Sequence, residues 1–355
     1  MTLSIKLNGT DYVDFVSAAV SKNMETLTSA FSFVATASND DFLPIREGDS
    51  IEVSADSSFK LLTGYVDSYA VRYNSTDHTI AVKGRSKLSD LVDSTVGAIK
   101  EFDRISLQDL CGNVIDELGV DARVKNLAGD IAVLEDIASA EVGQTAFAFL
   151  ESFARKRQVL LNEDSSGDLN IIRASTDLSD NALKNIFGEP DNNILSASRE
   201  IDISKLFNAY IAQGQLNPID LTDETTVAEL SGQFGTATDD EIRETRRYEF
   251  YSEETTDSFS LTDRAKWELG IRRARFGLVY KAVVQGHTYN DAVWEVNKLY
   301  QIDDEMCNIY DQLLCNKILY NFNLETGSTT ELSFTNKNAY TLQADLDKII
   351  LEATT

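Results

Sequence analysis

The chain has 355 residues, of which 58 are acidic and 32 basic, so its formal net charge at pH 7 is −26. A chain this acidic repels phosphate, which excludes nucleic-acid binding through a general electrostatic footprint and disfavours stable binding to anionic membranes. Its 43% hydrophobic content is sufficient for packed cores, and its length predicts two to four domains. With three prolines and 18 glycines it has no Pro- or Gly-rich linker, so we expect tightly joined domains.

Residues 1–97 are predicted to form a first β-barrel domain. Gly48–Asp93 reads GDSIEVSADSSFKLLTGYVDSYAVRYNSTDHTIAVKGRSKLSDLVD, in which apolar side chains alternate between turn signals. The alternating positions are Ile51, Val53, Tyr69, Val71, Tyr73, Ile80 and Val82. Met1–Leu7 also alternates, which is typical of a strand and not of a secretory signal. No apolar run is long enough to span a membrane, so we expect synthesis in the cytoplasm without a signal peptide.

Residues 98–200 are predicted to form a small α+β domain. An apolar stripe at helical spacing begins after Ser106, a typical capping residue, and ends at Gly119, a typical helix stop. A second helix is predicted near Thr145–Lys156, and the chain then turns in a hairpin at Asp164–Gly167.

The β pattern returns after residue 200 and predicts a second β-barrel domain from residues 201–221 and 277–340. The intervening residues 222–276 are acidic and Thr-rich at first and then carry a helix with many basic residues. Residues 341–355 are predicted to form a C-terminal helix with one apolar face.

The three cysteines fit a reducing compartment. Cys111 falls on the apolar face of a predicted helix and is expected to be a small core residue. Cys307 and Cys315 are placed to face each other across a hairpin, and whether they pair is left open.

The two β regions resemble each other. In the first, GDSIEV precedes LLTGYVDSYAVRYNSTDHTIAVKG, and in the second VNKLYQI precedes LLCNKILYNFNLETGSTTELSFTN. Aligning Gly64 with Asn316 brings the hairpins at Asn74–Ser75 and Thr326–Gly327 to equivalent places. Two interpretations are open: an internal repeat, or only the alternation that any two antiparallel barrels share.

One stretch resembles a known family. TGYVDS followed by IAVKGRSKLSDLVD is similar to the first barrel of the baseplate hub proteins of contractile-tailed bacteriophages, especially those of Mu-like phages. The similarity continues in Thr145–Ala174, Asn193–Gln215 and Asp291–Glu305. Pro218–Arg247 does not align, and the long polar tail of the Mu-type hub is not seen before Thr355.

This resemblance implies a fold class and a function. The fold is mainly β with α+β: two similar antiparallel β-barrel domains, a small α+β domain and an inserted helical segment. The implied function is a structural, non-enzymatic hub in the tail baseplate of the virion, made in the host cytoplasm. Two similar barrels in each chain of a homotrimer make a ring of six similar units, which adapts a sixfold tail tube to a threefold spike.

The implied partners are the tail tube or a tube-initiator protein above the ring and a trimeric spike protein below it. Baseplate wedge and tape measure proteins are further candidates. DNA only passes through the channel, and no stable membrane binding is expected. An acidic channel lining would repel phosphate as DNA passes, although solubility alone explains the same net charge.

The sequence shows little sign of a catalytic, metal or cofactor site. His78 and His287 have no second histidine or cysteine at ligand spacing, and no phosphate loop, nucleophile elbow or calcium loop occurs. We therefore expect no enzyme activity, no metal and no cofactor. Two alternatives are kept open: a tail-associated hydrolase that uses the carboxylates of the acidic loops Asp239–Glu241 and Asp303–Glu305, and a tail carbohydrate-binding protein.

The scarce basic residues concentrate on one predicted helix and just before it. In an acidic protein such a cluster is suited to an acidic neighbour, and it fixes register more than it adds affinity. The predicted interface residues are Arg264, Lys266, Trp267, Arg272 and Arg275. The alternative is that the arginines pair locally with Glu244, Asp263 and Glu268. Trp267 is the predicted interface anchor, whereas Trp294 is predicted to be in the core.

Overall fold

The computed structural model describes residues 3–36, 45–75, 78–97, 101–131, 138–214, 234–252 and 261–337. The chain divides into two compact units. The first comprises Met1–Ala154, Val159–Ser198 and Lys281–Phe334, and the second Arg155–Gln158, Arg199–Tyr280 and Thr335–Thr355. The predicted helix 341–355, and residues 222–233 and 253–260 of the predicted inserted segment, lie outside the described residues.

The first β region forms seven consecutive strands, and every pairing among them is antiparallel. Their spatial order is β3-β4-β7-β6-β5-β1-β2. The apolar alternation in the sequence matches the face of the strands that is buried, since Ile51, Val53, Ile80 and Val82 are all in the core. The strands are β1 (Leu3–Leu7), β2 (Thr10–Tyr12), β3 (Phe15–Asn23), β4 (Ala30–Thr36), β5 (Ser50–Ala55), β6 (Phe59–Tyr73) and β7 (His78–Ser86).

Two glycines let β6 and β7 approach closely beside a β-bulge. The pairing register shifts between Val66 and Ser68, so the two strands are locally irregular. A Cβ atom on Gly64 would overlap the carbonyl oxygen of Arg85, and one on Gly84 would overlap the carbonyl oxygen of Tyr65. The glycines of TGYVDS and IAVKGR are therefore required by packing.

The second β region is ordered β14-β18-β23-β22-β21-β13. β21 is antiparallel to β22 and parallel to β13. Its buried residues include four large aromatics: Tyr280, Tyr300, Tyr320 and Phe334. The strands are β13 (Leu178–Asn185), β14 (Ile194–Ile201), β18 (Leu278–Gln285), β21 (Leu299–Asp304), β22 (Ile309–Asn323) and β23 (Gly327–Asn336), with a short hairpin of β19 (Thr288–Tyr289) and β20 (Ala292–Val293).

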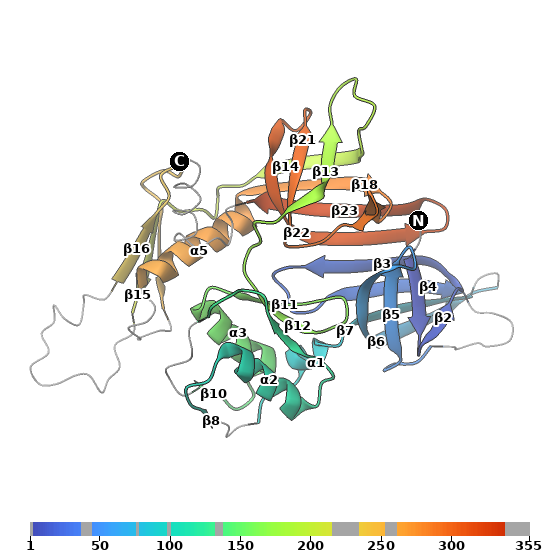
Figure 1. The fold of residues 1–355 in the computed structure, drawn as a ribbon, viewed down its shortest axis with the longest axis horizontal. Helices are drawn as coiled ribbons and strands as arrows, with labels where there is room; N and C mark the ends of the chain where they lie inside the picture. Colours follow the sequence, from blue (N-terminus) through green and yellow to red (C-terminus); the bar gives the residue numbers. More distant parts are fainter. Residues whose placement is uncertain are drawn as a thin grey trace, which may run out of the picture. The chain divides into compact units, whose positions relative to one another are not determined.

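The two β regions share one strand order. The series β3-β4-β7-β6-β5-β1 corresponds to β14-β18-β23-β22-β21-β13, and β6 and β22 have 15 residues each. The regions differ at the end of the series, where β1 is antiparallel to its neighbour and β13 is parallel. They are joined edge to edge, because β22 pairs with β3, and together they form a 13-stranded sheet in the described chain. Figure 1 shows this junction where the red β22 adjoins the blue β3.

A small α+β part follows the first β region. The helices are α1 (Ser89–Asp93), α2 (Leu107–Leu118) and α3 (Ala146–Lys156), and the strands are β8 (Glu101–Phe102), β9 (Val124–Asn126), β10 (Ala138–Ser139), β11 (Leu160–Glu163) and β12 (Leu169–Ile172). The Ser106 side chain accepts a hydrogen bond from the backbone nitrogen of Asp109 at 3.0 Å, and Gly119 ends α2 with φ of 68°.

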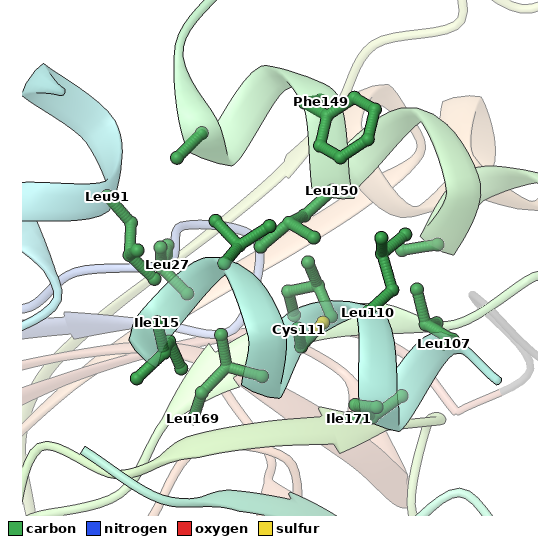
Figure 2. Packing of buried hydrophobic residues seen from close by; sticks show 14 of the residues in the cluster. Leu27, Leu91, Leu107, Leu110, Cys111, Ile115, Phe149, Leu150, Leu169 and Ile171 are labelled. Atoms are coloured by element: carbon green, nitrogen blue, oxygen red, sulfur yellow. The ribbon is translucent and has the colours of Figure 1, made fainter. Parts of the chain in front are cut away.

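Helix α2 packs between α3 and β12. Figure 2 shows Leu110 and Cys111 of α2 between Leu150 of α3 and Leu169 and Ile171 of β12, and all five residues belong to one buried cluster. The predicted fold class, mainly β with a small α+β part, is confirmed.

The second compact unit contains a three-stranded sheet and one long helix. The strands are β15 (Ala209–Gln213), β16 (Phe234–Thr238) and β17 (Arg247–Tyr251), and the helix is α5 (Leu261–Phe276). β15 lies in the middle, antiparallel to β16 and parallel to β17. A Cβ atom on Gly235 would overlap the backbone of Leu261, so the glycine allows α5 to contact β16. The core of the unit contains Tyr210, Ala212, Ala237 and Ala265.

Candidate assembly interface

Helix α5 carries all five residues predicted to form an interface, and two of them share one carboxylate. Glu268 accepts from Nη1 of Arg264 at 3.2 Å and from Nε of Arg272 at 2.8 Å. Each arginine is four residues, about one helical turn, from Glu268, the spacing at which opposite charges stabilise a helix. The local alternative considered from the sequence is therefore realised for Arg264 and Arg272 with Glu268.

Aromatic rings of the same unit also hold these arginines. The guanidinium of Arg272 lies 3.9 Å from the ring centre of Tyr248, and that of Arg264 lies 5.0 Å from the ring centre of Phe250. The rings of Tyr248 and Phe250 are themselves stacked with centroids 5.5 Å apart, and Phe207 stacks on Tyr248. These cation–π contacts stabilise the packing of α5 on β17. The sequence analysis missed this arrangement; the alternation of Tyr248 and Phe250 could have indicated it.

Arg273 on the same helix binds the first of the two predicted acidic loops. Its Nε donates to Oδ2 of Asp239 at 2.6 Å, and the Asp239 side chain is fully buried. Hydrogen bonding to Asp239 raises the pKa of Arg273. Glu241 lies 3.1 Å from the same guanidinium but is largely exposed. The buried Asp239 carboxylate is thus held in a structural ion pair with Arg273.

The remaining predicted interface residues differ in exposure. Trp267 is only 6% exposed, which leaves its ring little area to offer a partner, and Trp294 is in the core at 1% exposure. Arg275 is exposed, whereas Lys266 is half-buried. An interface role for the five residues stays a prediction.

The second acidic loop also has a structural role. Asp304 is fully buried, and its Oδ1 accepts hydrogen bonds from Asn185 Nδ2 and from the backbone nitrogens of Met306 and Cys307, at 3.1 to 3.2 Å. It therefore closes the turn between β21 and β22. Within the described ranges no group of three His, Cys, Asp or Glu residues is placed to hold a metal ion. In the described residues no disulfide joins Cys307 and Cys315.

His287 is a buried core residue. Its Nδ1 lies 3.2 Å from Oγ1 of Thr330, whose hydroxyl already donates to the carbonyl of Gly286 at 2.7 Å. The Thr330 oxygen therefore accepts from the imidazole Nδ1–H. Burial lowers the pKa of His287 to about 4, so the ring is neutral at pH 7.

We expect His287 to make the first unit less stable as the pH falls. Between its ordinary pKa near 6.5 and its folded pKa of about 4, the unfolded chain binds a proton that the folded chain does not. The free energy of unfolding is therefore highest above pH 6.5 and falls as the pH falls to 4. The total decrease due to His287 is at most about 3 kcal/mol. Urea unfolding of wild type and His287→Gln at several pH values measures this, with His78→Gln as the control. Equal pH slopes for wild type and His287→Gln would contradict it.

Two domain families match the amino-terminal half of the chain. Residues 2–86, which contain β1 to β7, match the family described as Mu phage baseplate assembly protein GpP-like, N-terminal. Residues 89–173, from α1 to the end of β12, match the second domain of the baseplate hub protein gp44-like family. The amino-terminal half of this chain is built from baseplate hub domains. The resemblance to baseplate hub proteins inferred from the sequence is thus confirmed for residues 2–173.

Solved tail proteins share the hub fold over nearly the whole chain. The 43 kDa tail protein of prophage MuSo2 from Shewanella oneidensis has a TM-score of 0.81 at 24% identity, covering 95% of this chain and 99% of that one. A tail protein from Neisseria meningitidis MC58 has a TM-score of 0.78 at 17% identity, covering 96% and 97%. Prophage tail protein gp18 from Listeria monocytogenes EGD-e has a TM-score of 0.61 at 11% identity, covering 99% of both chains. A sequence search of curated proteins finds no match.

None of the helices in the described residues is long and apolar enough to cross a membrane.

Proposed function

We propose that this chain is the structural hub of a contractile phage tail baseplate, and that three copies form a ring. The ring joins the sixfold tail tube, or a tube-initiator protein, to a threefold spike, and it encloses the channel for DNA. The observation that carries this proposal is the occurrence of one strand order twice in a single chain.

A chain with two similar β regions supplies two similar building blocks. Three such chains supply six blocks, so one body has both threefold and approximate sixfold symmetry. Closed rings arise when a head-to-tail interface is repeated through a rotation that closes. The edge-to-edge junction of β22 with β3 is already a head-to-tail contact between the two regions.

The charge and the polar clusters support a non-enzymatic role in the virion tail. A net charge of −26 suits a channel wall along which DNA slides without binding. In each acidic loop considered for a hydrolase, the buried carboxylate has a structural partner, since Asp239 binds Arg273 and Asp304 closes a turn. A trimeric spike, the tail tube, and baseplate wedge and tape measure proteins are the proposed partners, and DNA is only a passing occupant.

The mass of the purified chain in solution tests the proposal. Light scattering at micromolar concentration is expected to give three times the 39.4 kDa of one chain. A chain that stays monomeric in the presence of its spike protein would overturn the trimeric hub.

The same measurement on Arg275→Glu tests whether α5 contributes to assembly. We expect a smaller trimer fraction for this variant at low salt, because charge repulsion is screened less there.

A further inference from the structure

The junction inside the chain has a counterpart whose two strands are not paired with each other in the described residues. Within one chain, β22 of the second β region pairs antiparallel with β3 of the first, from Lys317 opposite Asn23 to Asn323 opposite Ser17. In the shared strand order, β6 corresponds to β22 and β14 corresponds to β3. A junction between β6 and β14 would therefore repeat the observed junction between β22 and β3.

Strand β14 is an open edge. It stands at the end of the sheet beside β18, and seven of its eight residues are exposed. Leu195 and Ile201 are both 57% exposed. The strand contains no proline or lysine, and its charged residues, Arg199 and Glu200, stand near its end, so Ile194–Ser198 can serve as a template for another strand. Its start, Ile194–Ala197 (ILSA), matches the start of β3, Phe15–Ala18 (FVSA), with the same Ser-Ala pair.

The outer half of β6 is the second open edge. β5 ends opposite Tyr65, and Val66 hydrogen-bonds to the backbone of Gly48 and Asp49. From Asp67 to Tyr73 the only paired neighbour in the described chain is β7. These residues are exposed apart from the half-buried Tyr69, and Tyr73 is 82% exposed. In β22 the equivalent stretch is the one that pairs with β3.

We propose that β14 of one copy pairs antiparallel with the outer half of β6, residues Asp67–Tyr73, of a second copy. The proposal rests on the proposed trimeric ring and names the surface that closes it. Each ring would then alternate β22–β3 junctions within chains with β6–β14 junctions between chains. The β6–β14 contact then uses both strand edges that the repeated junction leaves open, as a closed ring of such junctions requires.

The internal junction also sets the expected register. Aligning Gly64 with Asn316, and Ser17 with Ser196, carries the observed pair Phe322 and Ala18 onto Ala70 and Ala197. Both are small exposed residues, so cysteines there leave the fold intact. Cα atoms of directly opposite residues in an antiparallel pair are about 4.5–5.5 Å apart, a distance that a disulfide bridges.

Disulfide cross-linking tests the pairing. The variant Ala70→Cys/Ala197→Cys, with Cys307→Ser to remove the half-exposed native thiol, is oxidised and run on a non-reducing denaturing gel. We expect a covalent ladder that ends at three chains. Each single cysteine variant should stay unlinked, because the proposed contact joins different residues. The matched control Val71→Cys/Ala197→Cys should also stay unlinked, because a one-residue step turns the side chain to the other face.

Light scattering of the same samples before oxidation separates this proposal from the proposed function. Cysteines at 195 and 199, which lie on the same face of β14 as 197, allow for a register shifted by two residues. If the chain is a trimer by mass but a cysteine at 70 links to none of these three positions, the hub stands and the β6–β14 contact is overturned. The absence of trimers altogether would overturn the ring and this contact with it.

Discussion

Replacement of Gly84 or Gly64 by alanine is expected to destabilise the first unit by about 3 kcal/mol or more. A methyl group at either position would overlap a backbone carbonyl oxygen of the facing strand, that of Tyr65 or that of Arg85. Backbone atoms in a paired strand cannot move aside as a flexible side chain does, so the strands must separate. At Gly84 the methyl would also overlap the ring of Phe31, a buried core residue.

The measurement uses the distribution of the two tryptophans, since Trp294 lies in the first unit and Trp267 in the second. In a Trp267→Phe background the fluorescence of Trp294 reports urea unfolding of the first unit alone. Gly112→Ala is the matched control, because a Cβ there meets nothing within 4 Å and the residue lies inside α2. It should stabilise by about 0.5–1 kcal/mol. A Gly84→Ala variant as stable as the control would contradict the close-approach argument.

Asp239→Asn is expected to destabilise the second unit by about 3 kcal/mol. Its carboxylate is fully buried and binds the guanidinium of Arg273. The substitution removes the negative charge and leaves Arg273 half-buried without its main counterion. Arginine is not deprotonated at neutral pH even without a counterion, so loss of a proton from Arg273 cannot relieve the loss of the Asp239 charge.

The second loop carboxylate provides the control for this ion pair. Glu241 also contacts Arg273, but its side chain is 80% exposed. Glu241→Gln should therefore change stability by less than about 0.5 kcal/mol, as expected for exposed charges. Trp267 fluorescence in a Trp294→Phe background reports unfolding of this unit. Equal losses for the two variants would show that Asp239 acts as a surface charge and not as a buried one.

These two sites differ in how visible they are from the sequence. The glycines in TGYVDS and IAVKGR stand inside clear strand patterns, where glycine already indicates a bulge or a close backbone approach. The ion pair of Asp239 with Arg273 joins residues 34 positions apart, and nothing local indicates that this carboxylate is buried. The first acidic loop was accordingly considered for hydrolysis, whereas its buried member is bound to an arginine of α5.

The sequence by itself determined the local elements and the hub resemblance. Alternation is a property of neighbouring residues, so the strands from Ser50 to Ser86 and from Leu299 to Asn336 could be recognised from it. Capping is equally local, and Ser106 and Gly119 bound helix α2 as predicted. The internal similarity was also visible, because the aligned hairpins follow strands of equal length.

Only the tertiary structure decided which strands become neighbours. β13 and β14 lie in the stretch predicted to be part of the α+β domain, but they pair with β21 and β18, which lie far along the chain in the second β region. β15 was predicted for the second barrel, but it pairs in the small sheet of the other unit. Backbone N–H and C=O groups are alike in nearly every residue, so they do not specify which strand pairs with which. Partner choice depends on burial and on which edges remain open, and these exist only once the chain has folded. For that reason the unpaired edges of β6 and β14 could not be predicted from the sequence, although the β pattern of these regions could.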